Sequence, residues 1–102
     1  MRSDRYAAAF VTPDGQVEEH LSKHPWTVDL LGRLARDLGS RFFVVIDGED
    51  IENKQPIWAV FDMRTASPNG GGPRVWSIRD PVKTFPGNYD AAVMWAVHQA
   101  TT

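Results

Sequence analysis

The chain has 102 residues, the size of one ordinary domain, which leaves no room for separate catalytic and regulatory modules. Hydrophobic residues make up 42% and charged residues 24% of it, which excludes a wholly disordered chain, and the absence of cysteine excludes disulfides and thiolate chemistry. Eleven basic and thirteen acidic residues give a net charge of −2, without the basic excess of a dedicated nucleic-acid-binding protein.

The first part of the sequence predicts a β-hairpin followed by a helix. Residues 6–11 and 16–21 have the pattern of two strands, and the turn at 12–15 contains a proline that presets φ and a glycine that accepts a left-handed conformation. The second strand is mostly polar, which favours a position at the edge of a sheet. Apolar residues then recur on one side of a helix over 25–38, and Gly39 is expected to end it.

The middle of the sequence predicts three more strands. Residues 42–46 are apolar at both parities, which is typical of a central strand that is covered on both faces. Strands are also predicted over 57–63 and 74–79, and the glycine-rich stretch 67–73 between them is expected to form a hairpin loop.

The last part of the sequence predicts a connector and a second helix. Residues 80–88 contain two prolines, and Asn88 is expected to be the N-cap of a helix through about Ala100. The element order is β-β-α-β-β-β-α, and its short connections favour antiparallel pairing. We therefore predict a single α+β domain over residues 1–102, with about five mostly antiparallel strands and two helices.

Composition also bears on location and origin. No apolar run approaches the roughly 20 residues that span a bilayer, and the N-terminal apolar stretch is too short for a signal peptide, so we expect a cytoplasmic protein without membrane contact. Arginine outnumbers lysine eight to three, a bias typical of GC-rich bacteria and their phages. We expect the domain to need no cofactor.

The final helix carries the strongest candidate for a binding surface. If Tyr89 and Val93 face the sheet, a second, largely apolar side of the helix faces away from it. Exposed tryptophan and methionine are favoured at the centres of protein interfaces, so we expect this side to contact a protein partner or a second copy of the chain. The alternative is that the hairpin or the first helix covers it. The predicted interface residues are Ala91, Met94, Trp95 and His98, with Asn69, Gly70 and Gly71 of the loop as a second contact.

A second candidate is a nucleic-acid-binding strand face. Trp58 and Trp76 are predicted to be cross-strand neighbours flanked by basic residues, and such an arrangement stacks bases and meets phosphates. An ordinary sheet core produces the same pattern and is the commoner explanation. The residues of this alternative are Trp58, Arg64, Arg74, Trp76, Arg79 and Lys83.

The order α-β-β-β-α over residues 26–100 resembles that of a double-stranded RNA-binding domain. In that family the final helix opens with a lysine cluster that grips phosphates. The corresponding stretch here, residues 86–91, contains no lysine or arginine, so the resemblance is confined to element order and does not extend to RNA binding.

A third candidate is a metal-dependent nuclease. Asp47, Glu52 and Lys54 follow the order of a site in which two carboxylates hold a divalent cation and a lysine lies near the attacking water. The last two fall in an expected loop, which favours a solvated acidic turn.

We therefore expect a non-enzymatic regulatory domain that acts by protein–protein contact, such as a phage or mobile-element inhibitor of a host protein. Nucleic-acid binding and nuclease activity are the alternatives.

Overall fold

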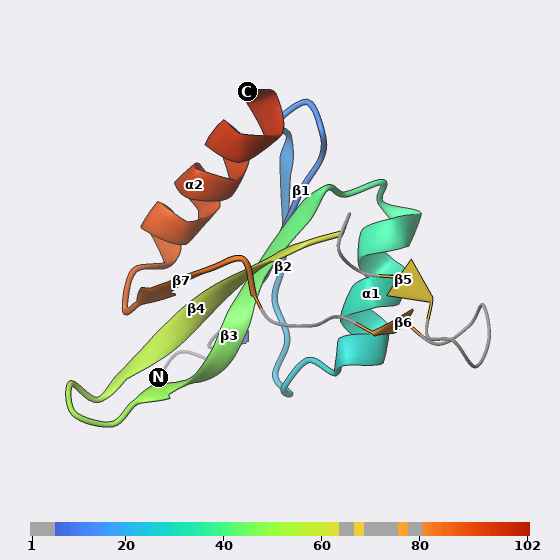
Figure 1. The fold of residues 1–102 in the computed structure, drawn as a ribbon. Coiled ribbons are helices and arrows are strands. Elements are labelled where there is room, and N and C mark those ends of the chain that lie inside the picture. The colour runs from blue at the N-terminus through green and yellow to red at the C-terminus, as the bar shows by residue number, and fades with distance from the viewer. Residues whose placement is uncertain (1–5, 64–66, 69–75, 78–80) are drawn as a thin grey trace.

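The computed structural model describes residues 6–63, 67–68, 76–77 and 81–102. Two helices pack on a five-stranded antiparallel sheet, which confirms the predicted α+β class and the order β-β-α-β-β-β-α (Figure 1). In sheet order the strands are β2 (Val17–His20), β1 (Ala8–Val11), β3 (Phe42–Asp50), β4 (Gln55–Asp62) and β7 (Lys83–Pro86). The helices are α1 (Val28–Asp37) and α2 (Tyr89–Thr101), and the short strands β5 (Ser67–Pro68) and β6 (Trp76–Ser77) pair separately.

The predicted N-terminal hairpin forms, with its turn at residues 12–15. The Thr12 N–H donates to the Gln16 carbonyl over 2.9 Å, and Gly15 takes a φ of +88° that a side chain would strain. The turn also lies against the end of α2, because a Cβ added to Gly15 would stand 2.7 Å from Cγ2 of Thr101. The hairpin is thus fixed at its tip by the C-terminal helix.

Helix α1 begins later than predicted and ends where predicted. Thr27 is its N-cap, and the Thr27 hydroxyl accepts a hydrogen bond from the Leu30 N–H over 3.2 Å, so Pro25 lies before the helix. At the other end, Gly39 has a φ of +70°, and its N–H donates to the Arg36 carbonyl over 3.0 Å. The Ser40 N–H donates to the Ala35 carbonyl over 2.8 Å, which completes a Schellman motif.

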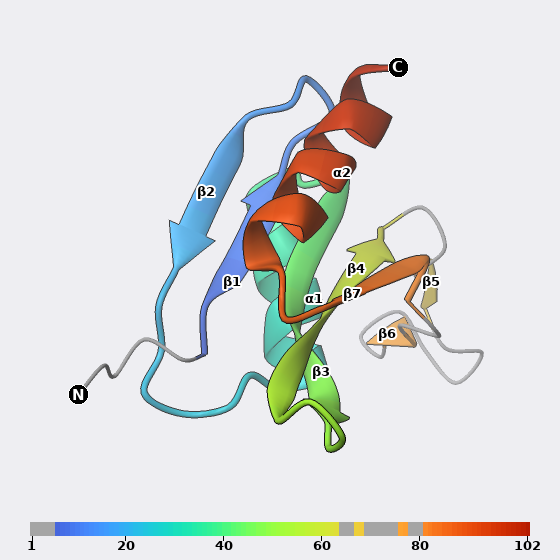
Figure 2. The same cartoon turned by 90° about the vertical axis from the view of Figure 1, so that its left-hand side faces the viewer.

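The two helices cover opposite faces of the sheet (Figures 1 and 2). On the α1 face, Phe10 and Phe43 of the sheet are buried with Leu31 and Ala35 of the helix. The core on the α2 face consists mainly of small and branched residues, namely Ala9, Val11, Val44, Val60, Ala92 and Ala96, with Phe42 and Trp58. Strand β3 is therefore central, and its residues 42–45 are covered on both faces, as the sequence predicts for 42–46.

The last strand of the sheet is not the one that the sequence predicts. Residues 76–77 of the predicted strand 74–79 pair with β5, and the remainder lies outside the described residues. The fifth strand of the sheet is instead β7, within the predicted connector 80–88, where Phe85 lies opposite Trp58. Its proline is tolerated because the outer side of an edge strand needs no backbone partner.

Candidate protein-binding surface

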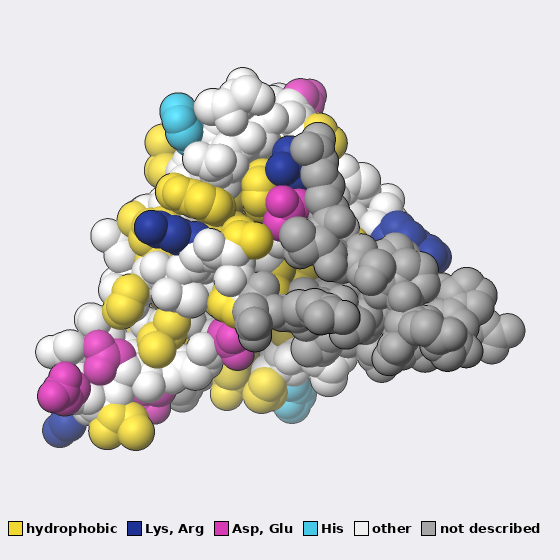
Figure 3. All heavy atoms as spheres, in the orientation of Figure 1, with side chains coloured by type: hydrophobic (Ala, Val, Ile, Leu, Met, Phe, Trp, Pro, Cys, Tyr) yellow, Lys and Arg dark blue, Asp and Glu magenta, His cyan; other side chains and the backbone are white. Residues whose placement is uncertain are grey.

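One side of α2 and the outer strand β7 form a continuous surface, which we call the α2–β7 surface. Figure 3 shows this face of the molecule, on which hydrophobic side chains gather next to a basic one. Four of the predicted interface residues contribute to it from the helix. The α2–β7 surface consists of Ala91, Met94, Trp95 and His98 of α2 with Lys83 and Phe85 of β7.

Met94 is the most exposed apolar side chain of this surface. It is 66% exposed in the middle of a helix, whereas Ala92 and Ala96 on the opposite side of the helix are fully buried. His98 is exposed one turn later, and Ala91 is partly exposed one turn earlier. The prediction that this side of the helix faces away from the core is therefore confirmed for Met94 and His98.

For Trp95 that prediction is wrong, because its indole packs against the sheet. The indole ring lies 6.1 Å from the Phe42 ring in an edge-on arrangement, and 6.4 Å from the Phe85 ring. The buried alanines let α2 approach the sheet closely, so a long side chain on the flank of the helix reaches down to the strands. Trp95 is only partly buried and so joins the core to the α2–β7 surface.

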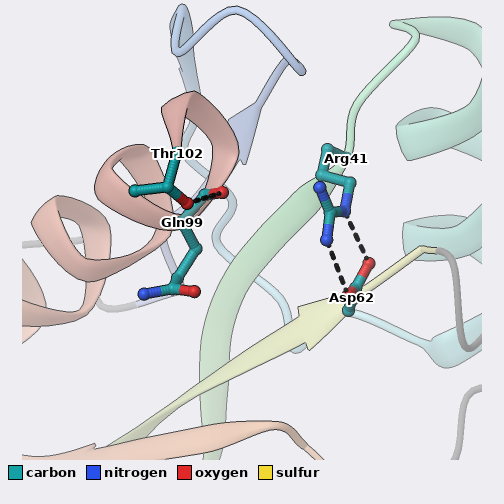
Figure 4. A network of polar contacts seen from close by, with 4 residues as sticks. All are labelled: Arg41, Asp62, Gln99 and Thr102. Carbon is teal, nitrogen blue, oxygen red and sulfur yellow. Dashed lines mark hydrogen bonds and ion pairs between the residues drawn. The ribbon is translucent and has the colours of Figure 1, made fainter.

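Two basic side chains beside this surface, Arg41 and Lys83, differ in whether they form an ion pair. Arg41 binds Asp62 through two contacts, Nε to Oδ1 at 3.0 Å and Nη2 to Oδ2 at 3.3 Å, and its guanidinium lies 4.6 Å from the centre of the Phe42 ring (Figure 4). Lys83 is exposed, with its ammonium 6.0 Å from the Phe85 ring, and it has no carboxylate partner among the described residues. The arginine is thus neutralised within the fold, while Lys83 is available to a partner.

Tyr89 fastens the first turn of α2 to the sheet. Its ring lies 4.5 Å from that of Trp58, and its hydroxyl donates to Oε2 of Glu19 on β2 over 2.5 Å. Burial, followed by the hydrogen bond to the Glu19 carboxylate, raises the pKa of Tyr89 well above its usual range. The orientation of α2, and hence of the α2–β7 surface, is set at this end by Tyr89 and at the other by the Gly15 turn.

The structure separates the residues of the nucleic-acid alternative. Trp58 lies opposite Ile46 and Phe85, whereas Trp76 lies opposite Pro68 in another sheet, so the predicted Trp58–Trp76 pair is wrong. Trp58 is 9% exposed and covered by Tyr89, which leaves no free ring face for a base. Lys83 is exposed, and the remaining predicted residues, Arg64, Arg74 and Arg79, lie outside the described residues.

The acidic residues of the nuclease alternative lie on the β3–β4 hairpin. Asp47 is exposed on β3, and Glu52 and Lys54 fall in the turn 51–54, as the sequence predicts. Over the described parts of the chain, no three histidine or carboxylate side chains converge to hold a metal ion.

The second predicted contact of the protein interface, the loop residues Asn69, Gly70 and Gly71, lies outside the described residues.

Sequence reasoning missed the contribution of Phe85, because the prolines around it indicate a connector. It also missed the Arg41–Asp62 pair, which joins distant parts of the chain.

Neither helix in the described part of the chain has the length and apolar character that crossing a membrane requires. Comparison of the chain with protein families, with curated proteins and with solved structures finds no match.

Proposed function

We propose that this chain is a small protein-binding domain whose α2–β7 surface contacts the partner. The observation that carries the proposal is the 66% exposure of Met94 next to the partly exposed aromatic rings of Trp95 and Phe85. Methionine adapts its shape to a facing surface, and aromatic residues dominate the energy of many interfaces. This combination suits the centre of a protein interface better than it suits a solvated helix face.

A protein partner also fits the charge of the surface better than a nucleic acid does. Lys83 is the one lysine or arginine among the six residues that define the surface, whereas phosphate binding draws on several cations. A single cation at the rim of an apolar patch is typical of protein interfaces, where it selects for a carboxylate on the partner.

The test compares two surface variants that each place a carboxylate on an exposed apolar position. Met94→Glu changes the α2–β7 surface, and Leu30→Glu is the matched control on α1, where Leu30 is 47% exposed. Each protein is immobilised and exposed to a lysate of the organism that encodes it, and a protein retained by the wild type is then purified for calorimetry. We expect Met94→Glu to weaken its binding at least about tenfold and Leu30→Glu to leave it unchanged.

Equal retention of all captured proteins by the three forms would overturn the proposal. Trp95→Ala is unsuitable for this experiment, since Trp95 also contacts Phe42 in the core and its loss would disturb the fold. Self-association is a separate outcome: sedimentation that shows a dimer for the wild type and a monomer for Met94→Glu would identify the partner as a second copy.

The sequence-based hypothesis of a phage or mobile-element inhibitor of a host protein concerns the origin of this chain and the kind of partner that it binds. We retain it as part of the proposal, supported by size and composition. The identity of the captured protein tests it directly. A host enzyme or regulator whose activity falls on binding would support inhibition, and a partner encoded beside this chain would contradict it.

A further inference from the structure

A cavity of about 160 Å³ lies where β1 begins, away from the α2–β7 surface. Its walls are mostly apolar, and the indole N–H of Trp26 is already used, since it donates to the Tyr6 carbonyl over 2.6 Å. Cavities of about this volume hold a group of the size of benzene. The cavity is lined by Tyr6, Ala7, Pro25, Trp26, Leu31 and Ile46.

Beside this cavity runs a stretch of strand that the described strands leave unpaired on one side. Residues 9–11 of β1 pair with residues 42–44 of β3, but β3 continues to Asp50. Over residues 45–50, β3 pairs with β4 alone among the described strands, and Figure 2 shows β3 and β4 continuing past the start of β1. A register shift between Ile46 and Glu49 interrupts this edge, so only a short strand can be added and a side-chain anchor is needed.

The hairpin that carries this edge is strongly acidic. Its four carboxylates lie within six residues, 47–52, and Lys54 is the one lysine or arginine of the hairpin residues 47–54. The Asn53 side chain donates to Oδ2 of Asp50 over 2.8 Å, whereas Lys54 forms no ion pair in the described part of the chain. A partner segment laid along this edge therefore meets negative charge. The four acidic residues are Asp47, Glu49, Asp50 and Glu52.

We propose that this edge of β3 binds a short, extended, basic segment of another protein as an added strand, with one aliphatic side chain of that segment in the cavity. Backbone hydrogen bonds to β3 provide part of the affinity, the cavity selects the side chain, and the acidic hairpin selects the basic flanks. The cavity, the edge of β3 that no other described strand pairs with and the charge are separate observations that indicate the same occupant.

The first test varies the peptide. The probe is a synthetic peptide of about six residues, the usual length of a strand, with a central leucine flanked by alternating lysine and threonine. We expect it to shift the indole N–H resonance of Trp26 and the amide resonances of residues 45–50. Exchange of leucine for alanine should weaken binding at least about tenfold, because the cavity then holds almost no side chain. Exchange of the lysines for glutamates should abolish binding.

The second test varies the protein. Ala7→Leu enlarges a side chain on the wall of the cavity and should weaken peptide binding. The exposed double variant Asp47→Lys with Glu49→Lys should weaken it without altering the core. Asp37→Lys, a charge reversal at an exposed position on α1, is the control and should bind as the wild type does. The absence of shifts at Trp26 and residues 45–50 with millimolar peptide would overturn the proposal, and so would equal binding of the lysine and glutamate peptides.

Discussion

Met94 and Trp95 are adjacent in sequence but belong to different environments. Met94 contributes to an exposed patch, whereas Trp95 packs on Phe42 and Phe85. A helical wheel places both residues on the side of α2 that faces away from Tyr89, because it records angle and not side-chain length. The wheel therefore identified the correct side of the helix but could not show that an indole on its flank reaches the sheet.

This difference predicts that two substitutions differ in their effect on stability. We expect Met94→Glu to change the free energy of unfolding by no more than about 0.5 kcal/mol, since it alters an exposed position. Trp95→Ala should lower that free energy by about 2 kcal/mol, which is less than a fully buried tryptophan would cost because the ring is only partly enclosed. Urea unfolding followed by circular dichroism measures both, and similar values for the two variants would contradict the assignment.

Tyr89 predicts a dependence of stability on pH. Its pKa is raised by burial in the folded protein, so the folded chain holds the phenolic proton more tightly than the unfolded chain does. The resulting stabilisation is fully present below the ordinary tyrosine pKa of about 10 and is lost as the pH rises toward the folded-state pKa. Tyr89→Phe should remove this part of the pH dependence.

The chain has two tyrosines, so a Tyr6→Phe variant isolates the titration of Tyr89. We expect the ultraviolet absorbance of tyrosinate in this variant to develop well above the ordinary range when the protein is folded, and at about pH 10 in urea. Titration at the ordinary value in both states would show that the contacts with Trp58 and Glu19 do not protect the hydroxyl.

At the scale of elements, local signals determined what could be predicted. The turn at 12–15, the Gly39 cap and the Asn88 cap each act within a few residues, and the elements they bound lie where expected. Strand β7 has no such local signal. Its place in the sheet depends on contacts with Trp58, which lies opposite Phe85 on the neighbouring strand and packs against the ring of Tyr89 from α2. The cavity could not be predicted from the sequence either, since three segments that are distant in sequence form it.

The contact between the hairpin turn and α2 predicts that two glycines differ in their tolerance of a side chain. Both Gly15 and Gly39 have positive φ, so replacement by alanine strains the backbone by roughly 1 kcal/mol at each. At Gly39 nothing lies within 4 Å of the added Cβ, whereas at Gly15 it meets Thr101 at 2.7 Å. Gly15→Ala should therefore destabilise more than Gly39→Ala.

Thermal unfolding of the two variants checks this order. The double variant Gly15→Ala with Thr101→Ser lacks the methyl group that the new Cβ would meet. It should recover the stability lost through this steric contact but not the stability lost through backbone strain. Equal destabilisation by Gly15→Ala and Gly39→Ala would indicate that α2 does not rest on the turn.

At the scale of the whole molecule, one sheet separates two cores that share none of the described buried residues. Val44 and Val45 are neighbours in β3, yet Val44 is buried under α2 and Val45 under α1. Val44 and Val60 lie on different strands but are paired across the sheet in the same core. If contact in space determines which substitutions interact, Val44 should be coupled to Val60. If adjacency in sequence determines it, Val44 should be coupled to Val45.

Double-mutant cycles of valine-to-alanine substitutions decide between these predictions. Each single variant should lower the free energy of unfolding by roughly 1–2 kcal/mol. Because Val44 and Val45 face different cores, their effects should add to within about 0.5 kcal/mol, whereas Val44 and Val60 line one cavity when truncated and should deviate from additivity by more than that. The transition should remain cooperative in every variant, since β3 belongs to both cores. Strong coupling between Val44 and Val45 would mean that the sheet transmits packing changes from one face to the other, and a partner bound at β3 would then also act on α2.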